Sequence, residues 1–215
     1  MNIIELIEQG ESSTLEFKST IENPAKIAKT LVAFANTGGG ILLIGVTDDK
    51  KICGIKSEVE IIGLLEEASD MYCHPPILIR YELIRTDGKE ILAVTIPESE
   101  DKPHLLKEKD GEETVYVRMH DKSVPTGKLT ARNLGSYGNG ADKTLMQSGN
   151  VKNLLKYLFS NEYITAKRYA KLINISERRA TRLLMELSSH QIVLPVERDK
   201  DVVYTLSSRN LSGKV

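Results

Sequence analysis

The sequence lacks tryptophan and has only three phenylalanines, two cysteines and no run of eighteen apolar residues. Because a membrane-spanning helix needs about 20 consecutive apolar residues, we expect no membrane partner. The first residues also lack the basic and apolar regions of a secretory signal. Cys53 and Cys73 do not have the spacing of a metal-binding pair, which favours buried, reduced thiols in a cytoplasmic protein.

Length and charge distribution together indicate more than one domain. The 215 residues exceed one average domain. From Val151 onward there are 12 Lys and Arg against 6 Asp and Glu, a net charge of +6. The first 150 residues hold 17 against 24, a net charge of −7, so the two parts give the overall −1. A basic part joined to an acidic part indicates that the basic part binds a polyanion. The Gly-, Ser- and Asn-rich stretch 133–142 marks the boundary, and we expect domains at 1–132 and 149–215 joined by a linker at 133–148.

A glycine-rich loop follows a predicted helix and precedes a predicted strand. The helix begins with Asn23 as N-cap and Pro24 at its first position, and its apolar residues recur at helical spacing to Ala35. The strand 41–46 is apolar on both faces, which predicts a central, covered strand. Between them lie Asn36, Gly38, Gly39 and Gly40. These glycines either end the helix at a close helix–strand crossing, or form a backbone surface that approaches a phosphate or a partner chain.

The order of these elements argues against nucleotide binding. A phosphate-binding loop runs from a strand into a helix, so that the free N–H groups of the helix face the anion. Here the loop follows the helix, and the Gly-Lys-Ser/Thr sequence that closes a Walker-type loop is absent. We therefore do not expect ATP as a cofactor.

The remaining patterns of the first domain predict a mixed α+β fold. Strand 15–18 places Glu16 and Lys18 on one face. A helix at 58–72, a hairpin of strands 77–85 and 90–96, and a strand at 114–119 follow. His74 and His104 lie in loops beside prolines, where a structural role is the more common one.

The second domain has the pattern of a small winged helix-turn-helix module. Three helices are predicted: one at 151–160, a short one that begins after a cap at Thr165, and one at 177–190 after a cap at Ser176. Strands 192–198 and 202–206 follow them. Such a module places its third helix in the major groove of DNA. The residues expected to contact DNA are on that helix and at the tip of the hairpin: Arg178, Arg179, Thr181, Arg182 and Lys200. The alternative is that these arginines form a solvated face and the module serves dimerisation or protein docking.

Several motifs of the first domain occur together in one known family. They are Glu11-x4-Glu16-Phe17-Lys18, the helix end Ala33 to Gly40, Gly45-Val46-Thr47-Asp48, Ile52-x-Gly54-Ile55, Pro103-His104 and Val115-Tyr116-Val117-Arg118. As a set they resemble the Schlafen AlbA-like domain, over roughly residues 8 to 132. The resemblance implies an α+β fold related to the Alba nucleic-acid-binding proteins, in a family whose bacterial members are often labelled DNA-binding or ATP-binding and are frequently followed by a winged helix.

The resemblance also implies a possible chemistry. In the animal Schlafen proteins that cleave RNA, two glutamates and an aspartate form a metal-dependent nuclease centre. Glu11, Glu16 and Asp48 match those positions, with Lys18 beside them. Clustered carboxylates of this kind bind Mg²⁺ or Mn²⁺, which activates water and stabilises phosphoryl-transfer transition states. This chain has one such lobe where the animal enzymes have two, has no counterpart of their zinc site, and would act as a homodimer.

Three hypotheses therefore remain. The preferred one is a DNA-binding transcriptional regulator, a homodimer in which an AlbA-like sensing or oligomerisation domain precedes a winged helix. The alternative is a Mg²⁺- or Mn²⁺-dependent endoribonuclease that uses Glu11, Glu16, Lys18 and Asp48 on RNA. The third, ATP binding, rests on the family label alone. Convergence of the three carboxylates would favour the enzyme, and their dispersal or burial would favour the binding module.

Overall fold

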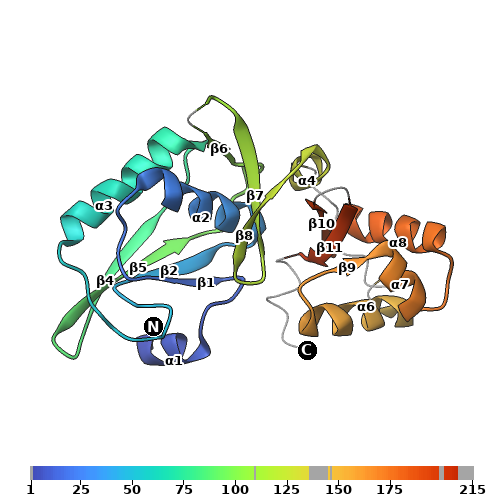
Figure 1. The fold of residues 1–215 in the computed structure, drawn as a ribbon, viewed down its shortest axis with the longest axis horizontal. Helices are drawn as coiled ribbons and strands as arrows, with labels where there is room; N and C mark the ends of the chain where they lie inside the picture. The colour runs from blue at the N-terminus through green and yellow to red at the C-terminus, as the bar shows by residue number, and fades with distance from the viewer. Residues whose placement is uncertain (1, 109, 136–144, 146, 199–200, 208–215) are drawn as a thin grey trace. The chain divides into compact units, whose positions relative to one another are not determined.

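The computed structural model describes residues 2–108, 110–135, 145, 147–198 and 201–207. The chain divides into two compact units, Met1–Pro125 and Thr126–Val215, and each is described by itself. Both units combine helices with β-sheet (Figure 1), which confirms the mixed α+β class. Among the described residues, no helix is long and apolar enough to cross a membrane.

Two four-stranded sheets form the first unit. The first has the order β1-β2-β5-β4, built from β1 (Leu15–Lys18), β2 (Gly40–Ile44), β4 (Arg80–Thr86) and β5 (Lys89–Ile96). β1 runs parallel to β2, and the other pairs are antiparallel. The second has the order β3-β6-β7-β8, built from β3 (Cys73–His74), β6 (Leu105–Lys107), β7 (Glu113–Met119) and β8 (Lys122–Thr126). The predicted central position of the apolar strand is confirmed, because β2 lies between β1 and β5.

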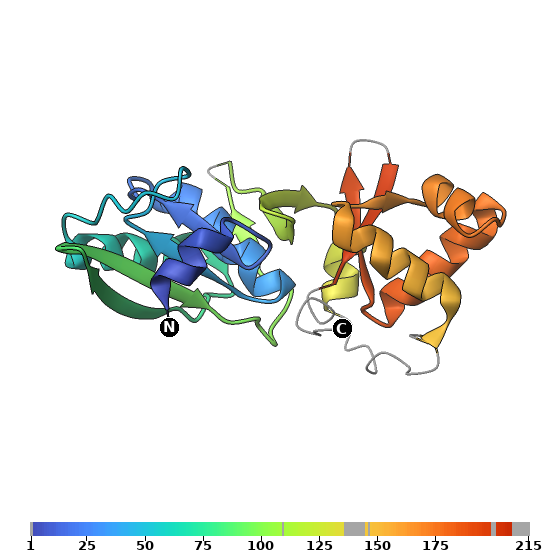
Figure 2. The ribbon, with the colours of Figure 1, turned by 90° about the horizontal axis from the view of Figure 1, so that it is seen from below.

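Helices cover both faces of the first sheet. On one face lie α2 (Pro24–Thr37), α3 (Glu58–Glu67) and the π-helical turn η1 (Ala68–Tyr72), and on the other lies α1 (Ile3–Gln9) (Figures 1 and 2). Leu42 and Ile44 of β2 face the α2 side, whereas Leu43 packs with Ile3 and Ile7 of α1. This alternation explains why β2 is apolar at every position, since both of its faces are buried.

The sequence signals at the start of α2 act as predicted. Asn23 is the N-cap, and its side-chain oxygen accepts hydrogen bonds from the backbone N–H groups of Ala25 and Lys26 at 2.9 and 3.3 Å. Ten of the helix's fourteen residues are buried, because α2 packs against α3, η1, β5, β6 and β7. This central helix therefore connects the two sheets.

The predicted helix 58–72 is found as α3 and η1, and the predicted hairpin as β4 and β5. Strand β4 begins at Arg80 rather than at residue 77. After β2, Val46 and Ile52 form an isolated antiparallel bridge. The cysteine prediction is half wrong: Cys73 is buried, but Cys53 is exposed. Burial raises the pKa of the Cys73 thiol to about 12, so that thiol is held protonated.

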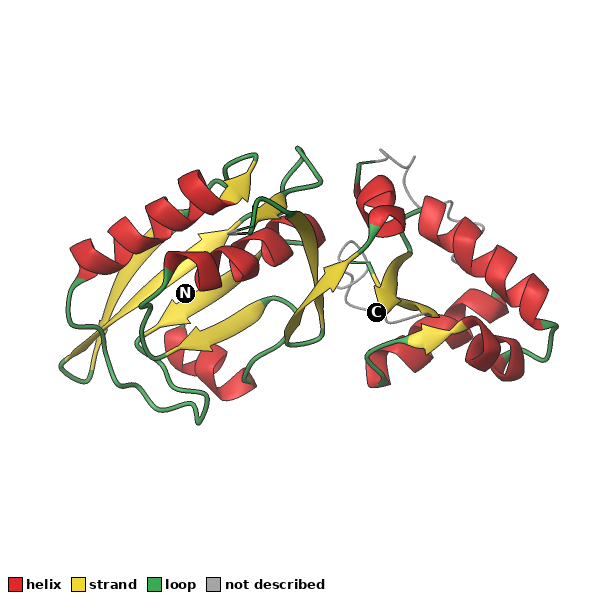
Figure 3. Cartoon of the chain, turned by 45° about the horizontal axis from the view of Figure 1, so that its top comes forward, coloured by secondary structure: helices red, strands yellow, loops and turns green. Residues whose placement is uncertain are grey.

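The second unit contains four described helices and a three-stranded sheet of order β10-β11-β9 (Figure 3). In chain order its elements are α4 (Lys128–Leu134), α6 (Gly149–Ser160), β9 (Ile164–Thr165), α7 (Ala166–Leu172), α8 (Glu177–Ser189), β10 (Val193–Arg198) and β11 (Asp201–Leu206). The three predicted helices and the predicted hairpin are present. Thr165 caps α7 by accepting from the Arg168 N–H at 3.1 Å, whereas Ser176 holds the N-cap position of α8 without a side-chain cap hydrogen bond.

Two predictions concern residues that the structure places in a helix or does not describe, namely the linker and the tip of the hairpin. The predicted linker begins at residue 133, but residues 133–134 belong to α4, and 136–144 and 146 lie outside the described residues. Lys200, predicted at the tip of the hairpin, also lies outside them.

Candidate functional site

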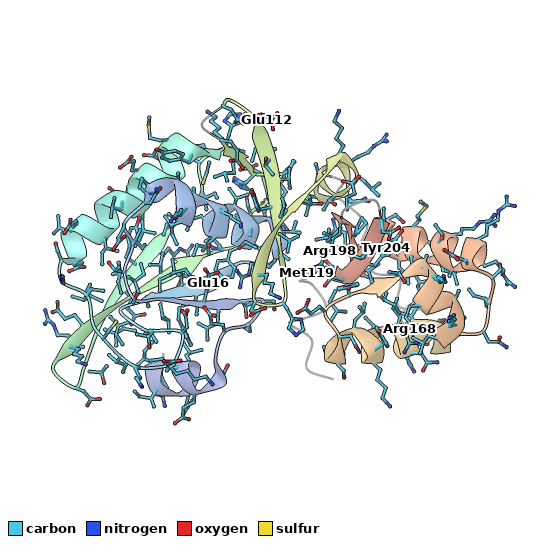
Figure 4. All side chains as sticks on the ribbon, in the orientation of Figure 1. Glu16, Glu112, Met119, Arg168, Arg198 and Tyr204 are labelled. Atoms are coloured by element: carbon cyan, nitrogen blue, oxygen red, sulfur yellow. The ribbon has the colours of Figure 1, made fainter. Side chains whose placement is uncertain are left out.

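Arg118 of β7 is almost completely buried in the first unit, with 2% of its surface exposed. Its Nη1 lies 2.5 Å from Oε2 of Glu16 on β1 and donates to Ser123 Oγ at 3.1 Å. Its Nη2 donates to the Ser12 carbonyl oxygen at 2.9 Å. Three segments of the domain therefore meet on one guanidinium group. Glu16, the partner that neutralises it, is labelled in Figure 4.

The helix α2 also contacts Arg118. The guanidinium carbon lies 4.6 Å from the centre of the Phe34 ring, a cation–π contact. The backbone N–H of Arg118 donates to Thr37 Oγ1 at 2.8 Å. Nε is buried and has no hydrogen-bond partner among the described residues. The arginine thus holds α2, β1 and β7 together.

The other oxygen of Glu16 is also engaged. Oε1 lies 2.8 Å from Lys18 Nζ and accepts from Thr30 Oγ1 at 3.3 Å. Glu16 and Lys18 share one face of β1, as predicted, but the pair is not a surface ion pair, because the Glu16 side chain is only 9% exposed. Lys18, with 39% of its side chain exposed, is the solvent-facing member. One negative and two positive side chains leave this cluster with a charge of about +1 at neutral pH.

Glu11 and Asp48 do not join this cluster. Glu11 Oε1 accepts a hydrogen bond from the Phe17 backbone N–H at 2.8 Å, so it closes the turn before β1. Asp48 is exposed in the turn after β2. Among the described residues, no group of three His, Cys, Asp or Glu side chains could hold a metal ion.

Mg²⁺ or Mn²⁺ would need free carboxylate oxygens at about 2.0–2.6 Å. Both oxygens of Glu16 instead accept from protein cations. The residues that the resemblance assigned to a metal do not fit one in this arrangement.

The glycine loop is packed against its own domain. Gly39 has φ +71°, and a Cβ there would lie 2.6 Å from the Ile96 carbonyl oxygen. A Cβ on Gly40 would overlap the ring of Phe34. The N–H groups of Gly38 and Gly39 both donate to the Phe34 carbonyl at the end of α2. These contacts are those of a close helix–strand crossing, the first of the two interpretations of the loop.

A hollow of about 330 Å³ does lie beside the glycines, but none of the described residues that line it has the basic side chain that a phosphate needs. Its lining consists of Leu6, Gln9, Ser12, Thr14, Leu15, Gly38, Gly39, Gly40, Ile41, Thr95, Ile96, Pro97 and Glu98.

Asn36 has a role that sequence reasoning missed. It is completely buried, and its Nδ2 donates to the carbonyl oxygens of His104 and Tyr116, each at 2.9 Å. Its Oδ1 accepts from the His104 N–H at 2.8 Å. Asn36 therefore connects the end of α2 to the second sheet. No local sequence signal indicates this role, because the burial of Asn36 and its bonds to residues 68 and 80 positions away come from the tertiary structure.

His104 is likewise structural in its contacts. Its Nδ1 lies 2.8 Å from the Pro75 carbonyl oxygen, while Nε2 is buried without a partner among the described residues. Burial lowers the pKa of His104 below its usual value, and the hydrogen bond to Pro75 opposes this only in part. His74, by contrast, is exposed.

Comparison with known proteins identifies the family of the first domain. Residues 11–127 match the family described as Schlafen, AlbA_2. The chain belongs to this family. No curated protein matches the sequence.

Two solved structures resemble about half of the chain. One is the DIP2311 protein from Corynebacterium diphtheriae, at 18% identity and a TM-score of 0.40, covering 54% of this chain and 26% of that one. The other is the N-terminal domain of a protein from Nitrosomonas europaea described as related to the ATP-dependent DNA helicase RecG. It has 21% identity and a TM-score of 0.42, and covers 55% of this chain and 88% of that one. This chain thus spans about a quarter of the DIP2311 protein.

Outside the Schlafen AlbA_2 match, α8 carries the second predicted site. Arg178, Arg179 and Arg182 are exposed, and none lies within ion-pair distance of a described carboxylate. Thr181 is half-buried, and its hydroxyl donates to the Glu177 carbonyl at 3.0 Å. Met185 follows Arg178 and Arg182 along the helix and is 56% exposed.

The opposite side of α8 packs into the core of the second unit. Ala180, Leu184 and Leu187 are buried there. This packing fixes which side of the helix faces solvent. The arginines are therefore presented on a stable helix rather than on a loop.

Proposed function

We propose that this protein is a DNA-binding transcriptional regulator. Its second unit acts as a winged helix-turn-helix module, and its Schlafen AlbA_2 domain acts as a sensing or oligomerisation domain. The observation that carries the proposal is the exposed arginine face of α8, made of Arg178, Arg179 and Arg182 without carboxylate partners among the described residues. An α-helix fits the major groove of B-DNA, where arginine binds phosphates and the edge of guanine.

The charge of the second unit supports DNA as its ligand. From Val151 onward the chain has a net charge of +6, by 12 basic and 6 acidic residues. Phosphate neutralisation by such residues releases counterions, so binding falls steeply as salt rises. The hairpin β10–β11 follows α8 directly, in the position of a wing. A homodimer would place two such helices on successive half-sites of an operator.

The metal-dependent nuclease is not the function that the contacts favour. Glu16 is buried between Arg118 and Lys18, and Glu11 accepts from a backbone N–H of its own turn. Their contacts support a structural role for the motif, and they leave the RNA-cleaving hypothesis without a supporting observation. The ATP hypothesis likewise has none.

A pair of matched double variants tests the DNA proposal. Arg178→Ala/Arg182→Ala removes two charges four residues apart on α8, and Lys152→Ala/Lys156→Ala removes two exposed charges at the same spacing on α6. Binding to duplex DNA is measured by fluorescence anisotropy over a range of salt concentrations. If both arginines contact phosphates, the slope of log K against log salt should fall in magnitude by about 1.8.

The lysine variant should change that slope much less, because α6 is not the proposed reading helix. If the two double variants lose DNA affinity equally, basic residues of α6 and α8 contribute equally to DNA binding, and α8 is not the helix that reads the DNA. Unchanged affinity in the arginine variant would refute the proposal.

A further inference from the structure

A second cavity lies in the first unit, away from Glu16 and the glycine loop. Its volume is about 610 Å³, within the range of about 300–1,000 Å³ that is common for small-molecule sites. Residues from the start of α2, the end of η1, β6, β7 and the described part of the loop between these strands line it. The described residues that line it are three lysines, two carboxylates, two tyrosines and three others: Lys26, Lys29, Lys107, Glu108, Asp110, Tyr72, Tyr116, Asn23, Ala25 and Leu106.

The lysines make this cavity positively charged. None of Lys26, Lys29 and Lys107 lies within ion-pair distance of a carboxylate in the part of the chain that the structure describes. Lys29 instead places its Nζ 5.1 Å from the centre of the Tyr116 ring.

Both carboxylates accept hydrogen bonds from other groups of the protein. Glu108 Oε1 accepts from the Tyr116 hydroxyl at 3.3 Å, and Asp110 Oδ1 accepts from the Glu112 N–H at 3.1 Å. Among the described lining residues, three lysines stand against two carboxylates, which gives a formal charge of about +1.

The helix N-terminus does not supply the anion contacts here. The N–H groups of Ala25 and Lys26 donate to the Asn23 side chain, that of Ile27 donates to the Asn23 carbonyl, and Pro24 has none. The first-turn donors that a helix usually offers to a phosphate are thus satisfied internally. Binding of an anion would depend on the lysine side chains, which makes the site testable by substitution.

The cavity also has an apolar part. Leu106 and Tyr72 line it together with Ala25. A bare inorganic anion would leave this surface in contact with water, whereas burying apolar area contributes about 25 cal/mol per Å². A ligand that fits both features carries an anionic group for the lysines and a flat apolar group for the remainder.

The geometry points to a binding site for a small organic phosphate, held through Lys26, Lys29 and Lys107 and packed on Tyr72 and Leu106. The inference rests on the proposed sensing role of the first unit, since it names the class of molecule that would be sensed. A nucleic-acid strand fits less well. Tyr116 is only 9% exposed and Lys29 lies over its ring, so it offers no stacking platform, and Glu108 and Asp110 would repel a continuous phosphate backbone.

Calorimetry on the full chain tests the site without DNA. The probes are 1-naphthyl phosphate and inorganic phosphate, which differ in the aromatic group. The variant Lys26→Ala/Lys29→Met removes two charges from the cavity while keeping most of the Lys29 stem over Tyr116. Its control, Lys51→Ala/Lys56→Met, removes two exposed charges of the same unit outside the cavity.

We expect 1-naphthyl phosphate to bind more tightly than inorganic phosphate, and to bind about tenfold or more weakly to the cavity variant than to the control. Glu108→Gln should tighten binding, because it removes a negative charge and keeps an acceptor for Tyr116. Absence of heat with both probes, equal weakening by the two lysine variants, or no preference for the aromatic phosphate would each overturn the inference.

A single-stranded oligonucleotide is also tested as a competitor of 1-naphthyl phosphate. If it displaces the aromatic phosphate, and the variant Lys26→Ala/Lys29→Met no longer binds it, the cavity is a nucleic-acid site and the inference is overturned. The arginine variants of α8 should leave the calorimetric result unchanged. The cavity and the DNA-binding proposal can therefore fail independently.

Discussion

Substituting Glu16 by alanine should destabilise the first unit strongly. Arg118 would keep its hydrogen bonds to the Ser12 carbonyl and to Ser123, but its charge would remain buried, with 2% of the residue exposed, and would lose its carboxylate. Removing one partner of a buried ion pair costs about 3–5 kcal/mol. The lost contact with the partly exposed Lys18 adds little, about 0–1 kcal/mol. The total is a large share of the roughly 5–15 kcal/mol that stabilises a typical domain.

Urea denaturation followed by circular dichroism measures this loss. With a slope of about 2 kcal/mol per M, a loss of about 4 kcal/mol moves the transition midpoint of the first unit down by about 2 M. Glu22→Ala, which removes an exposed carboxylate of the same unit, should change stability by less than about 0.5 kcal/mol. The double variant Glu16→Leu/Arg118→Met should recover much of the loss, because it removes the buried charge along with its partner.

Two outcomes would refute this reasoning. A Glu16→Ala variant that loses less than about 1 kcal/mol would mean that Arg118 is not held by this carboxylate. A variant that keeps its stability but loses a metal-dependent RNA cleavage would place Glu16 in chemistry instead. The stability measurement therefore separates the structural role of the motif from the nuclease hypothesis.

Two further predictions concern α2 and its contacts. Gly40→Ala should cost about 1–3 kcal/mol, because the new methyl group would overlap the Phe34 ring; Gly63→Ala in α3, where no atom lies within 4 Å, should instead stabilise by about 0.5–1 kcal/mol. Equal shifts of the urea midpoint in the two variants would contradict this assignment. Because burial lowers the pKa of His104, its stabilising contribution should be complete above the unfolded value of about 6.5 and should be lost as the pH falls toward the lowered folded value. The free energy of unfolding should therefore decline from pH 7 to 5, and His104→Gln, unlike His74→Gln in the exposed position, should flatten that decline.

Much of the fold could be predicted because its signals are local. Each of three signals lies within a short stretch of sequence: the Asn23 cap with Pro24, the strand β2 that is apolar on both faces, and the hairpin β4–β5. The helices α6, α7 and α8 likewise show apolar residues at regular spacing. By contrast, α1, α4, β3 and β6 have at most seven residues each, too few to establish a period by themselves. The helix α7 is equally short, and it is predicted because Thr165 supplies a cap signal at its start.

The site was harder to predict because its contacts join distant residues. Arg118 and Glu16 are 102 positions apart, and Asn36 and His104 are 68 apart. Nothing in residues 113–119 signals that an arginine turns inward, since arginine is seldom buried unless it is paired. The resemblance drew attention to the right residues, Glu16 and Arg118, but assigned Glu16 to a metal rather than to the arginine.

The spacing of the glutamate motif has a physical explanation that needs no metal. Glu11 accepts from the Phe17 N–H, and the Ser12 N–H donates to the Leu15 carbonyl at 2.8 Å, so the turn before β1 is closed at both ends. Closing it directs the Ser12 carbonyl to Arg118 Nη2, while Glu16 supplies the neutralising charge to Nη1. With four residues between them, Glu11 can close the turn while Glu16 pairs with Arg118. On this argument the motif serves to bury Arg118, and through it to connect β1, α2 and β7.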